Sequence, residues 1–239
     1  MTAILKREFT AYFTTPLGYV FIGVYLFCSG AFFYLFTLTS SAPSVGTADV
    51  SVLFTTMFFI LMVTIPILTM RLLSEERKNK TDQLTLTAPV SLTGLVTAKF
   101  AAAYAIFLIS TAVMPVYGII LDYYTDVNWL EIWGNIAGLL LLGAVYTSAG
   151  LFVSSLTENQ MIAAIISILL NISFLLSSIA ATYVNIGFIS DTLKSVSLLE
   201  RYSDFTIGVF DFSNLLFFIS MTAVFLFLTV RMLERRRWA

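Results

Sequence analysis

The charged side chains that could do chemistry in this chain gather in one short segment, Arg71 to Gln83. The chain is 59% hydrophobic and only 11% charged, yet this segment reads Arg-Leu-Leu-Ser-Glu-Glu-Arg-Lys-Asn-Lys-Thr-Asp-Gln. Alternating acids and bases of this kind can form ion pairs with a soluble partner. Because long apolar stretches lie on both sides, we interpret the segment as a short connection at a membrane face.

Several chemistries are excluded by residues that the chain lacks. It contains no histidine, which excludes histidine-dependent catalytic triads and histidine-containing metal sites. Cys28 is the only cysteine, and neither a Gly-x-Ser-x-Gly motif nor a phosphate-binding Gly-x-x-x-x-Gly-Lys-Ser/Thr loop occurs. We therefore expect no enzyme activity, no metal and no cofactor bound by this chain, and no ATP hydrolysis of its own.

The apolar stretches hold no ionisable residue near their centres. Arg71, Lys99, Glu158 and Arg231 all lie close to the ends of these stretches. Proton- or ion-coupled carriers usually keep a carboxylate or a cation in mid-membrane. If this chain moves a solute, the energy must therefore come from another protein.

Six long apolar stretches occupy most of the chain, whose mean hydropathy is +0.92. A bilayer core of about 30 Å needs roughly 20 apolar residues per helix, and these stretches lack the strict alternation of a membrane β-barrel. We predict an all-α polytopic membrane protein with one transmembrane domain over residues 1–239. The expected spans are Pro16–Leu38, Val52–Leu73, Leu95–Leu121, Ile132–Leu156, Gln160–Ala181 and Phe212–Met232.

Charge is distributed unevenly between the two sides of the predicted bundle. Six spans place both termini on one side, which carries most of the basic residues: Lys6, Arg7, Arg71, Arg77, Lys78, Lys80, Lys99, Arg231, Arg235, Arg236 and Arg237. The other side carries Lys194, Arg201 and the acids Asp49, Asp122, Asp126, Glu131, Asp191, Glu200, Asp204 and Asp211. The positive-inside rule predicts a multi-pass protein of the cell membrane with both termini in the cytoplasm.

Residues 1–15 are predicted to form an amphipathic helix in the cytoplasmic interface. Apolar residues recur there at helical spacing, namely Ile4, Leu5, Phe9, Tyr12 and Phe13. Lys6, Arg7 and Thr10 lie on the opposite face, and Pro16 begins the first span. The alternative is a frayed positive terminus that only orients that span.

Residues 74–91 are predicted to form a coupling element between the second and third spans. Thr81 is a candidate N-cap with Asp82 in the first turn, Leu84 and Leu86 follow, and Pro89 ends the helix. A partner that pushed on this helix would move both spans together. The alternative is a solvated loop whose charges only fix the topology.

Prolines and glycines within the spans predict local geometry. Pro66 in the second span and Pro115 in the third are each expected to kink their helix. Gly134 and Gly138 form a Gly-x-x-x-Gly motif that allows another helix to approach the fourth span closely.

Polar residues on one face of the fifth span admit two interpretations. Ser167, Asn171 and Ser178 could line a path, or they could hydrogen-bond neighbouring helices, which is the interpretation we favour. Residues 182–211 are predicted to form short amphipathic helices at the outer leaflet, because apolar residues again recur at helical spacing. These residues are Leu193, Val196, Leu199, Tyr202, Phe205 and Val209.

Motifs at the start, after the second span and at the end of the chain resemble one family. They are Lys6-Arg7-Glu8-Phe9, Tyr12-Phe13, Thr15-Pro16-Leu17, Thr69-Met70-Arg71, Glu75-Glu76-Arg77-Lys78, Thr81, Leu84, Ala88-Pro89-Val90-Ser91, Phe210-Asp211 and Glu234-Arg235-Arg236. Together they resemble type-2 ABC transporter permeases, in particular the branch that includes gliding-motility permeases. That family usually has Gly where this chain has Lys80, and often Glu where it has Gln83.

The resemblance implies a permease subunit that pairs with a second copy or a related permease and binds cytoplasmic ABC ATPase subunits, which hold the ATP and Mg. It implies ATPase contacts at the interfacial helix, Lys6, Arg7, Glu8 and Phe9, and at the coupling residues Glu75, Glu76, Arg77, Lys78, Thr81, Asp82, Gln83, Leu84 and Pro89. It also implies an external gate with Leu199, Tyr202 and Phe205. An accessory extracytoplasmic subunit is a further candidate partner, and nucleic acid is not expected.

The function that these observations favour is an ATP-driven exporter in which this chain supplies the membrane path. A second hypothesis is a non-transporting scaffold through which an ABC ATPase drives an extracytoplasmic partner mechanically. A channel is disfavoured because there is no ring of charges and no filter-like loop. The sequence does not identify the substrate, although aromatic and apolar spans suit a lipid-like or hydrophobic cargo.

Overall fold

The computed structural model describes residues 2–38, 50–81, 91–124, 127–183, 197–206, 208 and 211–238. These residues form helices joined by turns, and no strand occurs among them. Six helical stretches within the described ranges are long and apolar enough to cross a membrane. The prediction of an all-α polytopic membrane protein is confirmed.

The first half of the chain holds the helices that form the charged connection. They are α1 (Thr2–Thr14), α2 (Pro16–Phe32) with its π-helical continuation η1 (Phe33–Leu38), α3 (Ser51–Thr69) and α4 (Ser74–Lys78). Thr15 is extended, with φ −107° and ψ 154°, and Pro16 supplies the first helical position of α2. This junction separates α1 from the first span because proline cannot continue the hydrogen bonds of a preceding helix.

The second half contains α6 (Leu92–Thr111), α7 (Met114–Tyr124), α8 (Trp129–Leu156), α9 (Gln160–Tyr183), α11 (Leu198–Thr206) and α12 (Phe212–Trp238). The third predicted span is therefore two helices, which meet at Ala112 and Val113. Pro115 lies in the first turn of α7, where it cannot donate to the carbonyl of Thr111. The predicted distortion at Pro115 is confirmed as a helix break, whereas α3 continues through Pro66 as one helix.

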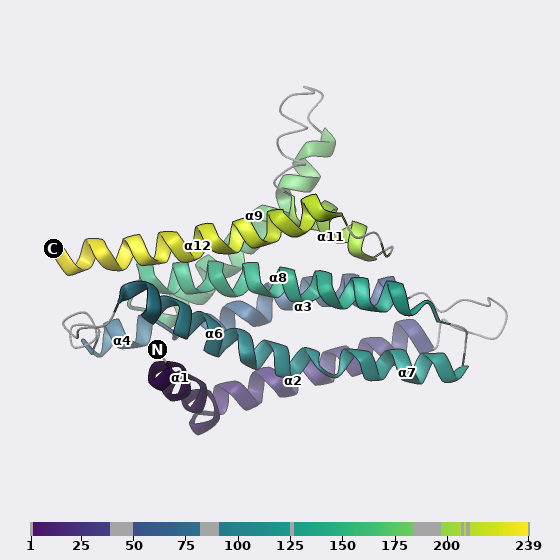
Figure 1. Cartoon of the computed structure of the whole chain (residues 1–239), viewed down its shortest axis with the longest axis horizontal. Coiled ribbons are helices and arrows are strands. Elements are labelled where there is room, and N and C mark those ends of the chain that lie inside the picture. Colours follow the sequence, from purple (N-terminus) through teal and green to yellow (C-terminus); the bar gives the residue numbers. More distant parts are fainter. Residues whose placement is uncertain are drawn as a thin grey trace.

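Both chain ends lie at the same end of the bundle, on the left in Figure 1. We call this end the terminal face, and it is formed by α1, α4, the first turns of α6, the α8–α9 turn and the last turns of α12. Helix α7 reaches the opposite end of the bundle. Helix α11 lies next to the first turns of α12, away from the terminal face.

Helix α8 is the centre of the bundle. Of its most apolar stretch, 72% is buried, and it packs against α3, α6, α9, α11 and α12. Three glycines of α8 admit side chains of its neighbours: Gly138 contacts Phe205 of α11, Gly143 contacts Phe107 of α6, and Gly150 contacts Thr69 of α3. A Cβ at Gly138 would lie only 2.8 Å from Cβ of Phe205, so the close approach predicted at this glycine is confirmed.

We expect Gly150→Ala to lower the thermal stability of the purified protein, because the new methyl group would lie 3.0 Å from Cβ of Thr69 and nearer still to its hydroxyl. Gly23→Ala on α2 is the matched control, since nothing lies within 4 Å of a Cβ built there. The measurement is the melting temperature of each variant in detergent. Equal stability of the two variants would contradict the tight packing of α3 on α8.

Candidate functional site

The charged segment after α3 folds back on itself as a closed turn. Helix α4 ends in a Schellman motif, in which Thr81 N–H donates to Glu76 O at 2.9 Å and Lys80 N–H donates to Arg77 O at 3.1 Å. Lys80 takes the left-handed backbone conformation, with φ 55°. Glycine adopts this conformation without strain, so Lys80→Gly would fit the same turn. Thr81 thus closes α4, and the prediction that it begins a further helix falls on residues 82–90, outside the described residues.

One serine of α8 holds the connection between α3 and α4. The buried Ser154 hydroxyl accepts hydrogen bonds from the N–H groups of Leu73 (3.0 Å) and Ser74 (3.1 Å) and donates to Met70 O at 3.0 Å. It therefore satisfies backbone groups that the helix ends leave unpaired. The end of α3 and the start of α4 are fixed to the core of the bundle at this point.

A second attachment joins α4 to the turn between α8 and α9. Arg77 Nε lies 2.8 Å from Glu158 Oε1, and another guanidinium nitrogen donates to Leu156 O at 2.9 Å. Arg236 of α12 donates to the neighbouring carbonyl of Ser155. Three elements of the terminal face therefore meet at the end of α8.

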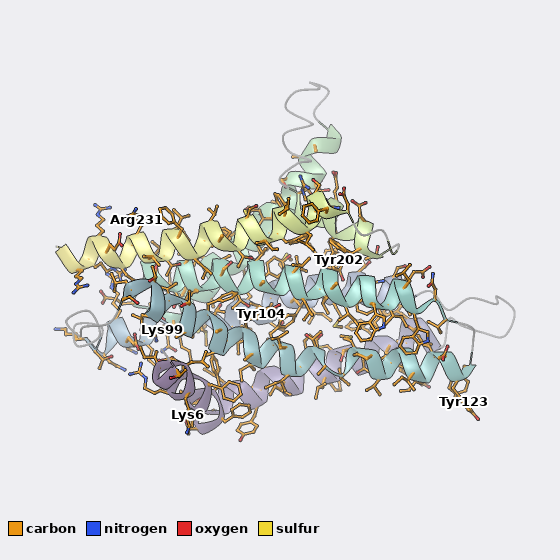
Figure 2. The ribbon with its side chains drawn as sticks, in the orientation of Figure 1. Lys6, Lys99, Tyr104, Tyr123, Tyr202 and Arg231 are labelled. Atoms are coloured by element: carbon orange, nitrogen blue, oxygen red, sulfur yellow. The ribbon has the colours of Figure 1, made fainter. Side chains whose placement is uncertain are left out.

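The third attachment is a buried ammonium group. Lys99, in α6, is only 1% exposed, and its Nζ lies 2.9 Å from Leu72 O, 2.8 Å from Glu76 Oε1 and 3.2 Å from Glu8 Oε1. Arg7 contacts the same two carboxylates, at 2.7 Å from Glu8 and 3.1 Å from Glu76. Figure 2 shows Lys99 beside α1 and α4 at the terminal face. Two carboxylates and two cations thus form a neutral cluster across three helices.

Burial alone would raise the pKa of the Glu8 carboxyl, because a charge is poorly stabilised away from water. Attraction to Lys99 and hydrogen bonds from Arg7 and Lys99 outweigh burial and hold the pKa below its ordinary value. Glu8 therefore stays ionised, and the ion pair to Lys99 persists under ordinary conditions. A cavity of about 160 Å³ lies beside the cluster, lined by Glu8, Ala11, Tyr12, Arg71, Leu72, Glu75, Glu76 and Lys99.

Further hydrogen bonds fix the position of α1. The Tyr12 hydroxyl donates to Leu68 O at 3.1 Å, and Arg71 donates to the Thr15 hydroxyl at 2.9 Å. Arg71 Nε also pairs with Glu75 at 3.0 Å. The helix predicted over residues 1–15 is thus attached to the end of α3; its place in a membrane interface stays a prediction.

The structure separates the predicted coupling residues into two groups. The side chains of Glu76 and Arg77 are 18% and 29% exposed and are engaged within the subunit, whereas Lys78 is exposed. Asp82, Gln83, Leu84 and Pro89 lie outside the described residues. The ATPase contact of all these residues stays a prediction, but Lys78 is the charged coupling residue that is best placed to meet a partner.

The three candidate path residues of α9 are wholly or partly buried in the subunit. Asn171 is buried and donates to Met62 O at 3.1 Å. Met62 O is the carbonyl that lacks its usual intrahelical partner, because the fourth residue after it is Pro66. The favoured hypothesis of an interhelical hydrogen bond is confirmed for Asn171. Ser167 is also buried, and Ser178 donates to Glu200 of α11 at 3.4 Å; a path-lining role of these residues stays a prediction.

The predicted gate residues lie on α11 and are largely docked into the core. Tyr202 and Phe205 are buried, and the Tyr202 hydroxyl donates to Phe54 O at 3.0 Å. Asn135 of α8 donates to Thr206 O at 3.2 Å, while Leu199 is half-buried. Any gate built on α11 must therefore move together with α3 and α8, or break these contacts.

Lys99 and Ser154 were missed as site residues by the sequence argument, and Glu8 was placed on the interfacial helix without its partner Lys99. Lys99 was noted only for its place near a span end, although a lysine on the buried face of a span requires a counter-charge. Glu8 carried a related signal, because it lies one helical turn from the apolar Tyr12. Ser154 gave no signal, since serine is common in membrane helices.

The fold and the site define a polytopic membrane subunit whose charged residues connect its helices at one face. Residues 43–231 match the model of the ABC-2 family transporter protein, which covers most of the chain. The chain therefore belongs to the ABC-2 transporter family and is the membrane subunit, or permease, of an ABC transporter. Members of this family associate with ABC ATPase subunits. No curated protein matched the chain. The narrower resemblance to gliding-motility permeases stays a prediction.

Replacing Asn171 with leucine should destabilise the protein by about 1 kcal/mol, because Met62 O would lose its hydrogen bond in the membrane interior. The effect should shrink in a Pro66→Ala background, where residue 66 regains an N–H for that carbonyl. Melting temperatures of the four proteins of this double-mutant cycle measure the coupling. Additive effects would show that the bond does not compensate for the proline.

Acidification should detach α1 from α6 only at a pH below the ordinary glutamate pKa of 4.5. Because the folded-state pKa of Glu8 is lowered, its ion pair stabilises the docked helix above that value, and this contribution is lost as the pH falls through the lowered pKa. The measurement is the mobility of a spin label at the exposed Thr10 in a Cys28→Ser background. In Glu8→Gln the label should be more mobile at neutral pH and should change less on acidification. An identical pH response in both proteins would contradict the assignment to Glu8.

Proposed function

We propose that this permease is half of an ATP-driven exporter and receives movement from cytoplasmic ATPase subunits at its terminal face. The observation that carries the proposal is the convergence of α1 and α4 on that face, each tied to membrane helices by buried polar contacts. A load applied to either element reaches the spans through hydrogen bonds and ion pairs. The sequence has no nucleotide-binding motif of its own, so the energy source lies in the partner.

The terminal face is the cytoplasmic face in this proposal. Lys6, Lys78, Arg235 and Arg237 are exposed there, and basic residues are enriched on the cytoplasmic side of membrane proteins. The opposite end of the bundle carries the exposed acid Asp122. This orientation presents α1 and α4 to a soluble ATPase and puts α11 on the extracytoplasmic side, at the outer leaflet.

We further propose that the path forms between two permease subunits, as a homodimer or with a related permease. Within the subunit, Ser167 and Asn171 of α9 are buried, Asn171 bonds α3, and α8 is tightly packed. The supporting argument is that a tightly packed subunit core has no room for a cargo, so that the cargo would pass between two subunits. Aromatic and apolar spans suit a lipid-like or hydrophobic cargo, which motivates export as the direction.

Lys78→Glu should weaken the association with the ATPase while membrane insertion stays normal. Lys78 is preferred to Glu76 or Arg77, because reversing those charges would also break ion pairs inside the permease. The assay is co-purification from detergent with the ATPase identified by mass spectrometry. Asp122→Lys, an exposed charge at the opposite end, is the matched control and should leave association unchanged. Equal ATPase recovery for Lys78→Glu and the wild type would count against contact at α4, and the absence of any ATPase would overturn the proposed function.

A further inference from the structure

A single buried side chain connects three elements of the terminal face. Lys99 belongs to α6, and its ammonium group contacts Glu8 of α1 and Glu76 of α4. Its third contact is Leu72 O, in the turn that follows α3. An ammonium group has three N–H donors, and the three acceptors at 2.8–3.2 Å match that number.

The buried ion pairs of Lys99 restrict the relative positions of the helices more than they stabilise the fold. A buried ion pair is often no more stabilising than apolar side chains of similar volume, because removing the charges from water is costly. Removing one partner, however, leaves a buried charge without compensation. The contacts of Lys99 therefore hold only while α1, α4 and α6 keep their relative positions, and separating any of them is strongly unfavourable.

The position of Lys99 along α6 makes this connection effective. It lies two turns into a helix that runs unbroken from Leu92 to Thr111 and ends at the break before Pro115. Farther along the same helix, Phe107 fits against Gly143 of the central helix α8. A displacement of the first turns of α6 is thus carried along one rigid helix to the middle of the bundle.

We propose that Lys99 is a positioning residue that joins α1, α4 and α6 into one rigid lever. The inference rests on the proposed function for the source of the force, since the ATPase would act on α1 and α4. Through this lever, a displacement of α1 and α4 by the ATPase also displaces α6. Without Lys99, α1 and α4 would move separately relative to the spans. The existence of the lever can be measured in the permease alone.

The first experiment measures distances in the full-length protein in lipid nanodiscs. In a Cys28→Ser background, spin-label pairs at the exposed positions Thr10 and Thr93, and at Asn79 and Thr93, report α1 against α6 and α4 against α6. We expect one narrow distance for each pair in the parent protein and broad distributions in Lys99→Met. Lys78→Met, which removes an exposed lysine of α4, should change neither pair. Narrow distances in Lys99→Met would overturn the proposal.

A second variant separates positioning from folding. Lys99→Met with Glu76→Gln leaves Glu8 and Arg7 as a balanced pair, so the cluster stays neutral while the bridge between α4 and α6 is absent. Its melting temperature should recover relative to Lys99→Met, but its label distances should stay broad. Lys99→Arg keeps a cation that can bridge both carboxylates and should restore narrow distances at least in part. Narrow distances in the neutral double variant would show that Lys99 only balances charge, and would overturn the lever.

The complex with the ATPase supplies the functional readout. Labels at Thr93 and at the exposed Arg235 of α12 report movement of α6, and ATP should shift this distance in the parent protein but not in Lys99→Met, which changes no predicted ATPase-contact residue. An equal shift in both would overturn the proposal. If the parent permease binds no ATPase, the proposed function fails, yet the distances in the permease alone still decide whether α1, α4 and α6 form one body.

Discussion

A charge or a backbone group that leaves water must find a partner inside the protein, and this constraint shapes each polar contact described above. The ammonium of Lys99 is buried, so it takes two carboxylates and a carbonyl oxygen from three elements. The same requirement brings Asn171 to the carbonyl released by Pro66 and Ser154 to the end of α3. In each case the group that needs a partner and the group that supplies it lie on different helices, so satisfying the constraint also fixes the packing.

Helix α8 is the common neighbour of most of the other helices, because its small residues let them approach closely. Gly138 accommodates α11, Gly150 accommodates α3, and Ser154 binds the turn that leads to α4. One helix thus carries attachments to the coupling element at the terminal face and to the predicted gate helix toward the other end. A movement that reaches α8 is shared by both ends of the bundle, and for this reason the two predicted functional elements are not independent.

The spans and the charged segment could be predicted because hydropathy and charge are local properties of a sequence. The break before Pro115 followed from the chemistry of proline, and the close approach at Gly138 from the missing side chain. The partners of Lys99 could not be predicted, since several acids of the terminal face were equally available. The packing of α1 against α6 selects Glu8, and the turn that follows α3 brings Glu76 to the same lysine. Asn171 was predicted to bond a neighbouring helix, but the acceptor depends on the relative heights of α3 and α9, which a sequence does not give.

The attachments of α4 differ in strength, and this difference bears on how a push would spread. Arg77 and Glu158 are 29% and 60% exposed, so water and salt weaken their pair, and exposed pairs contribute little stability. The hydrogen bonds of Ser154 are buried but neutral, each contributing about 1 kcal/mol. The Lys99 cluster is buried and charged, so it resists separation most strongly. A force applied to α4 should therefore break its contact with the α8–α9 turn first, while α1 and α6 move together with α4. The terminal face can thus open at the boundary between α4 and the α8–α9 turn.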